Sequence, residues 1–357
     1  MTAATSDTDD RFPFPIPFGW FCIGYPDDVP ANESKALFYF EKHLVAWRDG
    51  DGVLHVQDAF CPHLGAHLGH GGRVEKGCLV CPFHGWSFDA DGVNVEIPYS
   101  ERTNRKGRLR TYPVVEVNGL TFVWYHPDDT VAPMWEVPSF PEFEGSEDWS
   151  TLITFSYELE SAAQELAENG VDSAHFRYVH NTAEVPVLDA YDTGFPVAAM
   201  RSTQKFPTPR GVMEGRIDST SYGPGLSYIS FSGIIDTLNL GCATPIDRQR
   251  CLLRFNFRFR TMGDLATTEG VGRAFTNEVN KQVLEDKVIW EHKAHLVRPA
   301  LADTDGPFTK FRKWYAQFYA EGVAEDRLVY EPPWWPERAG ESPAKATASA
   351  RWGTPDQ

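Results

Sequence analysis

Two short segments of the sequence each bring a cysteine and a histidine together. The first is Cys61-Pro-His63 and the second is Cys81-Pro-Phe-His84. These are the ligands of a [2Fe–2S] cluster in which two thiolates hold one iron and two imidazoles hold the other. The imidazoles raise the reduction potential to roughly −150 to +300 mV, against about −400 mV for plant-type clusters held by cysteines alone. The two segments therefore predict a carrier of single electrons.

Two other interpretations of these residues are open. A zinc site is one, because Cys78 lies close to Cys81 and His84 in the sequence. Structural zinc sites, however, usually use cysteine pairs about two to four residues apart, and the Cys61–His63 spacing is too short for that pattern. The other interpretation is a set of buried, hydrogen-bonded side chains without a metal. The remaining cysteines, Cys22, Cys78, Cys242 and Cys251, are expected to be reduced and buried.

A second group of metal-binding residue types follows about a hundred positions later, with Asp172, His175 and His180. Asp172 and His175 share one face of a helix, whereas His175 and His180 converge only if the helix ends or loosens between them. Two histidines and one carboxylate are the ligands of non-haem Fe(II) sites that keep open positions for O₂. Buried histidines with ordinary hydrogen-bond partners are the alternative, and the upstream Cys/His segments favour iron.

The third ligand must come from elsewhere in the chain, and we expect Asp286. On a helix, Asp286 belongs to a half-apolar stripe with i, i+3, i+4 spacing, made of Phe275, Val279, Gln282, Asp286, Ile289 and Lys293. The stripe points Asp286 inward, where an unpaired carboxylate would be costly. Glu285 lies about 100° away around the helix and is the weaker candidate.

The elements that position these residues fall into two regions. Between about residues 36 and 125, short strands alternate with turns such as Asn118-Gly119, and the two Cys/His segments are expected at hairpin tips. Prolines between 127 and 141 indicate a linker, and strict alternation over Arg254–Arg260 predicts a half-buried strand beyond it. We expect an α+β protein: an all-β [2Fe–2S] domain over 17–128 and a helix-grip antiparallel-sheet catalytic domain over 129–336. A disordered N-terminus (1–16) and a flexible tail (337–357) are expected at the ends.

Composition narrows the partners. The formal net charge of −17 argues against nucleic acid and against an anionic membrane surface. The sequence has no long apolar run and no signal-peptide pattern, so a cytoplasmic location is expected. A basic segment, Arg102–Arg110, stands out from this acidic background. It is interpreted either as a docking site for an acidic reductase or ferredoxin, or as a solvated loop.

Together these motifs resemble those of the large subunit of Rieske non-haem iron oxygenases, over roughly residues 17–330. The resemblance implies that Cys61, His63, Cys81 and His84 bind a Rieske cluster, and that His175, His180 and Asp286 bind Fe²⁺. It implies that Asp172 links a cluster histidine of a neighbouring subunit to an iron-ligand histidine, because in this family the two metals of one subunit are too far apart. A head-to-tail homotrimer is therefore implied. Asn169 falls where the family often has a polar residue near the iron.

Narrower likenesses concern the substrate and the electron donor. Cys61–Ala66 and Ile97–Tyr99 resemble the cholesterol 7-desaturases, whereas Leu284–Lys293 and Arg312–Tyr319 resemble the 3-ketosteroid 9α-hydroxylases. Both groups share a sterol-sized apolar pocket, which implies a monooxygenase that uses O₂ to hydroxylate a steroid at an unactivated carbon. A separate NAD(P)H-dependent flavin/iron–sulfur reductase, with or without a ferredoxin, is implied as electron donor. A sterol desaturase, an oxygenase of aromatic compounds and a lipid-binding redox sensor are the alternatives.

Overall fold

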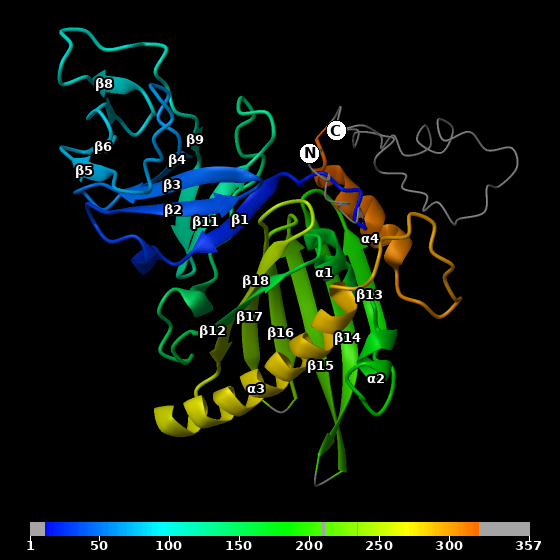
Figure 1. Ribbon diagram of the computed structural model, residues 1–357. Helices are drawn as coiled ribbons and strands as arrows, with labels where there is room; N and C mark the ends of the chain where they lie inside the picture. The colour runs from blue at the N-terminus through cyan, green and yellow to red at the C-terminus, as the bar shows by residue number, and fades with distance from the viewer. Residues whose placement is uncertain (1–10, 209–210, 234, 321–357) are drawn as a thin grey trace, which may run out of the picture.

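The computed structural model describes residues 11–208, 211–233 and 235–320, and its ribbon divides into an all-β part and an α+β part (Figure 1). The all-β part contains three antiparallel sheets. In spatial order their strands are β1 (Gly19–Gly24), β11 (Leu120–Tyr125) and β10 (Val114–Val117); β2 (Ser34–Tyr39), β3 (Lys42–Arg48), β4 (Leu54–Asp58) and β9 (Thr111–Tyr112); and β5 (Arg73–Glu75), β6 (Cys78–Val80), β7 (Ser87–Phe88) and β8 (Asn94–Glu96).

Turn residues explain the hairpins of this part. Asn118 and Gly119, which join β10 to β11, have φ of 60° and 74°, and a two-residue type I′ turn needs positive φ at both positions. The second Cys/His segment lies at the tip of the β6–β7 hairpin, as expected. The first does not lie between paired strands. It follows β4 and is closed by an antiparallel bridge between Phe60 and His67, so the expected hairpin is reduced there to a single bridge.

The α+β part is built on one seven-stranded antiparallel sheet. Its spatial order is β12 (Ile153–Leu159), β18 (Cys251–Phe259), β17 (Thr237–Pro245), β16 (Ser227–Ser232), β15 (Gly211–Tyr222), β14 (Val197–Thr208) and β13 (Val187–Thr193). The helices are α1 (Ala163–Asn169), α2 (Ala174–Tyr178), α3 (Leu265–Trp290) and α4 (Phe308–Tyr315). Short 3₁₀ turns span Pro26–Asp28, Pro141–Phe143 and Ala316–Phe318.

Helices cover one face of this sheet, which is the expected helix-grip arrangement. α3 runs across the sheet in Figure 1, and α1 and α3 pack on the same face of β18, where Leu166 and Val283 share one buried cluster with Leu253. The side chain of Asp264 caps α3 by accepting a hydrogen bond from the Thr267 amide. The sheet therefore forms one wall of the interior, and the helices form the other.

The inward face of α3 differs in part from the expected stripe. Asp286 points inward as expected and is 6% exposed. Ile289, however, is 45% exposed, and Lys293 lies beyond the end of the helix. Trp290 takes the buried position instead, because it lies four residues after Asp286 and seven after the buried Val283, on the same face of the helix. The stripe was therefore wrong at its C-terminal end.

The N-terminal prediction also needs correction. Residues 11–16 were expected to be disordered, but Phe12, Phe14 and Ile16 are buried, and the ring of Phe14 stacks on Tyr319 with centroids 5.8 Å apart. Alternating apolar residues give this segment enough area to pack. Residues 1–10 and the predicted tail at 337–357 lie outside the described residues. No helix within the described ranges is long and apolar enough to cross a membrane.

The two parts of the chain share a core. Phe18, Trp20 and Trp124 of the all-β part belong to the same buried cluster as Leu240 and Trp314 of the α+β part. The buried guanidinium of Arg254 on β18 donates to the backbone carbonyls of Cys22 and Ile23 on β1, at 2.8 and 3.3 Å. The seven-stranded sheet is thus fixed against the all-β part by a buried polar contact.

Candidate metal centres

The two Cys/His loops have the same backbone frame. The amide of Cys61 donates to the Ala66 carbonyl and that of Cys81 to the Trp86 carbonyl, five residues on in each loop. In both loops a glycine four residues after the cysteine donates back to the cysteine carbonyl, and these glycines, Gly65 and Gly85, have φ of 75° and 73°. Only glycine adopts this conformation without strain. The shared frame presents one cysteine and one histidine from each loop.

Within this frame the four side chains fit a [2Fe–2S] cluster. Cys61 and Cys81 are each 2% exposed, and the His63 and His84 rings lie 4.7 Å apart. Burial, together with the neighbouring Cys81, raises the pKa of Cys61 to about 11, so the pair needs a cation to hold both thiolates. The Nδ1 atom of His84 is buried and has no hydrogen-bond partner among the described residues. A buried nitrogen without a hydrogen-bond partner needs an explanation, and a role as metal ligand supplies one.

The surroundings of the loops are partly apolar and exposed. Trp86 stacks on the ring of His63, with centroids 4.6 Å apart and planes 5° from parallel. Leu64, Phe83 and Tyr99 are 65%, 61% and 62% exposed. Cys78, which the zinc interpretation needs, lies in β6 and is half-buried rather than buried. Exposed apolar side chains gathered in one place are typical of interaction surfaces.

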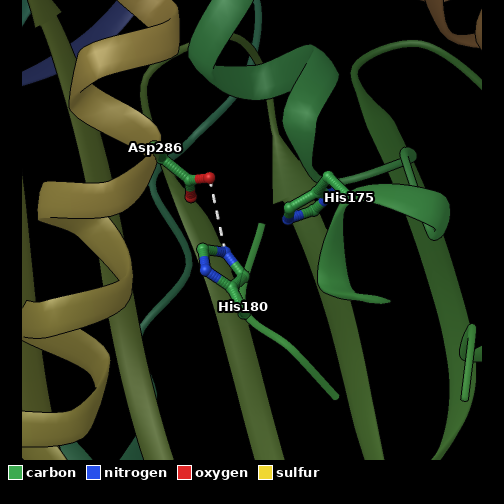
Figure 2. A group of neighbouring side chains, drawn as sticks. All are labelled: His175, His180 and Asp286. Atoms are coloured by element: carbon green, nitrogen blue, oxygen red, sulfur yellow. Dashed lines mark ion pairs between the residues drawn. The ribbon is translucent and has the colours of Figure 1, made fainter. Parts of the chain in front are cut away.

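A second cluster of ligand side chains lies between α2 and α3 (Figure 2). The ligand atoms of His175, His180 and Asp286 all lie within 4.8 Å of one another, and theirs is the one such group of three found in the described residues. His175 is in α2, which ends at Tyr178, so His180 lies beyond the helix and turns back toward His175, as the sequence predicted. Asp286 comes from α3, and its Oδ1 is 3.3 Å from Nε2 of His180.

Hydrogen bonds at the far side of each imidazole fix its orientation. Nδ1 of His175 faces the backbone carbonyl of Asp172, which leaves Nε2 toward the centre of the group. Nδ1 of His180 bonds to a carboxylate oxygen of Glu285 at 2.9 Å. Metal-binding histidines almost always donate their second N–H to such a carbonyl or carboxylate. Glu285, weighed as a ligand in the sequence, contacts the back of a ligand instead.

The pKa values of the two histidines shift in opposite directions. Burial lowers the pKa of His175, and this outweighs the nearby carboxylates, so its imidazole is neutral at neutral pH. Burial also disfavours the charged form of His180, but its hydrogen bonds to Asp286 and Glu285 raise its pKa. The Asp286 and Glu285 carboxylates thus favour a positive charge at this position. A divalent ion would satisfy the same negative charge, so the donor set fits Fe²⁺.

Asn169 and Asp172 lie beside this group. The Asn169 amide nitrogen is 3.3 Å from Oδ2 of Asp286 and 3.3 Å from Nε2 of His175. The Asp172 carboxylate accepts from the Ala174 and His175 amides at the start of α2, and it is 33% exposed. Its Oδ1 is 4.0 Å from Nδ1 of His175. Asp172 therefore contacts a histidine of the group through its backbone and shows its carboxylate to the surface.

A cavity adjoins the group on the inner face of the sheet. Its wall is formed by apolar and small neutral side chains of α1, α2, α4 and six strands, with none of the charged residue types among them. Phe176, which follows His175, lines it, as does Phe255. Phe257 and Phe259 are fully buried core, and Arg254 and Arg258 point away from the cavity. Sequence reasoning missed three serines in the wall, Ser219, Ser221 and Ser227.

Sequence comparisons cover nearly all of the described chain. Residues 19–113 match the Rieske [2Fe–2S] domain family, and residues 123–319 match the family described as the 3-ketosteroid 9alpha-hydroxylase C-terminal domain. The oxygenase component of a 3-ketosteroid-9-alpha-monooxygenase from Rhodococcus rhodochrous is 31% identical over 319 residues, covering 85% of this chain and 84% of the relative. The cholesterol 7-desaturase of Caenorhabditis elegans is 28% identical, covering 86% and 77%.

Solved structures agree with this fold. Dicamba monooxygenase bound to dicamba superposes with a TM-score of 0.69 at 21% identity, covering 84% of this chain and 96% of that one. A mutant of NdmA from Pseudomonas putida with caffeine superposes with a TM-score of 0.68 at 20% identity, covering 83% and 89%. The expected α+β fold with a Rieske domain is confirmed. The chain belongs to the 3-ketosteroid 9α-hydroxylase family of Rieske non-haem iron monooxygenases, and its cofactors are a [2Fe–2S] cluster and a mononuclear iron.

Proposed function

We propose that the protein is the oxygenase component of a monooxygenase that hydroxylates a steroid, a 3-ketosteroid or sterol derivative, at an unactivated carbon. The observation that carries this proposal is the cavity that Phe176 lines next to His175. Among the residues that the structure describes, none of those in the cavity wall is charged. Burying an unpaired carboxylate in such a wall would be costly, whereas a large apolar ring system gains free energy there. Relatives named for 3-ketosteroids and cholesterol support the same class.

We assign the metal ligands from the geometry described above. Cys61, His63, Cys81 and His84 hold the cluster, and His175, His180 and Asp286 hold the iron. When bound, the cluster supplies single electrons and the iron supplies an open coordination position for O₂. Glu285 holds Nδ1 of His180 and the Asp172 carbonyl holds Nδ1 of His175, so that Nε2 of each ring would be left to bind the metal. Asn169 fixes the free oxygen of Asp286 through its amide.

Transfer of electrons between the two centres is proposed to need a second copy of the chain. In Figure 1 the cluster loops, beside β6, lie at the opposite end of the molecule from α2. The exposed apolar side chains around the cluster suit burial against another subunit. Asp172, whose carboxylate reaches the surface beside His175, is the proposed point of contact for that subunit's cluster histidine. A head-to-tail homotrimer satisfies this arrangement for every copy.

The electron donor is proposed to dock near the basic segment Arg102–Arg110. Arg105 and Lys106 are exposed, and Gly107 packs so tightly on Trp86 that a Cβ atom there would lie 2.8 Å from its ring. Since Trp86 stacks on His63, the basic segment lies one residue layer from the cluster. A separate NAD(P)H-dependent flavin/iron–sulfur reductase, or its ferredoxin, would be attracted there by opposite charge. A cytoplasmic location remains our inference from the sequence.

Desaturation of a sterol is a second candidate, favoured by the likeness to cholesterol 7-desaturase. The solved structures of similar fold hold dicamba and caffeine, but at an identity of about a fifth they support only the fold. The neutral cavity also disfavours aromatic acids. The membership of the chain in a monooxygenase family weighs against the lipid-binding sensor.

A single-turnover experiment tests the function. Iron-loaded, chemically reduced protein is exposed to O₂ with 3-ketosteroids, sterols, steroid acyl thioesters and aromatic acids, and products are read by mass spectrometry. One added oxygen on a 3-ketosteroid is the expected result. Loss of two hydrogens would instead favour the desaturase. Product from aromatic acids alone would overturn the steroid assignment, and absence of product with full iron and a reducible cluster would count against all of these substrates.

A further inference from the structure

Three serines interrupt the apolar wall of the cavity. Ser219 and Ser221 are two positions apart on β15, so their side chains share one face of the sheet. Ser227 on β16 is paired directly with Ser221 in the strand register and lines the same cavity. Because residues two apart on a strand are separated by about 7 Å, the serines form a short polar strip rather than isolated groups.

The hydroxyls of this strip keep unused hydrogen-bonding capacity. Oγ of Ser221 is 2.9 Å from Oγ of Ser227, and this contact uses one of the two hydroxyl protons. The second proton and the remaining lone pairs are free to turn to the cavity. Within the described part of the chain, the Ser219 hydroxyl has no hydrogen bond to another side chain or to the backbone. The strip therefore has donors and acceptors that the protein itself does not satisfy.

The neighbours of the strip are apolar or lack a side chain. In the strand register Ser219 lies between Met200 and Ile229, and Ser227 lies opposite Gly241. A pure hydrocarbon bound here would take water away from the hydroxyls and give nothing in return, which costs free energy. A ligand that carries an oxygen at this place would restore the lost hydrogen bonds. The wall thus distinguishes ligands by an oxygen substituent, not by charge.

The strip also lies at a defined place relative to the iron ligands. The cavity is bounded on the helical side by Gly170 and Phe176, and the Phe176 ring is 4.3 Å from His175 and 5.8 Å from His180. The serines lie on the sheet wall, close to the β15–β16 turn, in which Gly225 packs on the backbone of Trp20. A rigid ligand held at the strip can therefore present only certain carbons to the metal.

We propose that Ser219, Ser221 and Ser227 bind a ketone or hydroxyl oxygen of an otherwise apolar polycyclic substrate, and that this contact determines which carbon is oxidised. The inference rests on the proposed steroid function and deepens it. These serines are specificity-determining residues. They take no part in electron or proton transfer.

The test measures binding and product position with the holoenzyme. Two ligand pairs are titrated: a 3-ketosteroid with its 3-deoxy counterpart, and an aromatic ketone with its parent arene. The variants are Ser219→Ala and Ser221→Ala/Ser227→Ala. The matched control is Ser230→Ala, on β16 but on the opposite face of the sheet. Thermal melting of each variant establishes that it is folded, and products are located by NMR.

For the 3-ketosteroid, Kd is expected to rise about tenfold in the double variant. This is the upper end of the loss in affinity expected when one neutral hydrogen bond is removed. The deoxy ligand should bind the double variant and the native protein equally, and Ser230→Ala should change the Kd of neither ligand. The double variant should give more than one hydroxylated product. Equal weakening of both ligands, or no change for the ketone, would overturn the inference while leaving the steroid function standing. If only the aromatic pair binds and its ketone depends on the serines, the steroid function fails and the oxygen-binding strip survives. If neither ketone depends on the serines, the inference is wrong.

Discussion

Glu285 and Asp286 are adjacent in the sequence, and we propose different tasks for them at one metal. Asp286 directs an oxygen at Nε2 of His180, whereas Glu285 bonds to Nδ1 on the other side of the same ring. Replacing Asp286 by alanine removes the proposed ligand, and because the side chain alone is only 9% exposed, water cannot readily substitute for it. We expect Asp286→Ala to lose its mononuclear iron.

Glu285→Ala should behave differently. Loss of a group that orients a metal-binding histidine typically weakens metal binding by about 10–100-fold, or roughly 1.4–2.7 kcal/mol. The Glu285 side chain is 29% exposed, so water can take its place at Nδ1 of His180. The expected loss is therefore at the low end, about tenfold. Glu285→Ala should still carry iron when iron is in excess.

The assay uses the cluster as an internal standard. Total iron is divided by acid-labile sulfide, so that iron beyond the cluster's share reports the mononuclear site, and competition with a ferrous chelator gives its Kd. Glu278→Ala is the matched control, because Glu278 and Glu285 are on the same helix and both pair with Lys281 at 3.7 Å. Iron lost from Glu285→Ala but retained by Asp286→Ala would move the ligand by one residue. An unchanged Kd in Glu285→Ala would refute the orienting role.

Three further predictions concern other parts of the molecule. Asp172→Asn keeps the side-chain oxygen that accepts hydrogen bonds from the first amides of α2, so the melting temperature and metal content of the variant should match those of the native protein. Its turnover with the reductase should be lost. Near-native turnover would exclude the carboxylate from the electron path. Reversing the charges of Arg105 and Lys106 should raise the KM for the reductase and flatten its dependence on salt, whereas an unchanged KM would leave the segment an ordinary solvated loop. Glu165 is fully buried between His295 and Lys293. Burial opposes the ionisation of Glu165, but these two partners outweigh it and lower the pKa of Glu165 to about 2. The ionised carboxylate therefore stabilises the fold at pH values above its unfolded pKa, and this stabilisation is lost as pH falls toward 2. Denaturant titrations should find Glu165→Ala about 3–5 kcal/mol less stable than the native protein at pH 7, with a smaller difference at pH 3, and a difference independent of pH would contradict the assignment.

Local chemistry explains which parts of the fold could be read from the sequence. The Asn118-Gly119 turn could be located because few residues tolerate positive φ at both positions. The convergence of His175 with His180 followed from helix geometry, since the five-residue spacing requires the helix to end. Asp286 was placed inward by its apolar neighbours. In each case the signal lay within one turn or one helix.

The parts that the sequence left open depend on contacts between distant segments. Ser219 and Ser221 alternate with polar and charged neighbours on β15, so no difference in polarity marks the face that lines the cavity. The role of Glu285 required knowing where His180 lies relative to α3. The burial of Phe12 and Phe14 depends on Tyr319 and His295, nearly three hundred residues away. Tertiary packing decided these points.

The contact of Arg254 with the carbonyls of β1 has a consequence for how the protein unfolds and how it can be divided. If the all-β part were cut away, the Arg254 guanidinium would lose the acceptors that compensate for its burial, and the apolar core shared by Trp124 and Leu240 would be opened to water. Neither part is then complete by itself. The two should melt in one cooperative transition, and the electron-carrying half should not be exchangeable for that of a distant relative unless β1 and β18 are exchanged together.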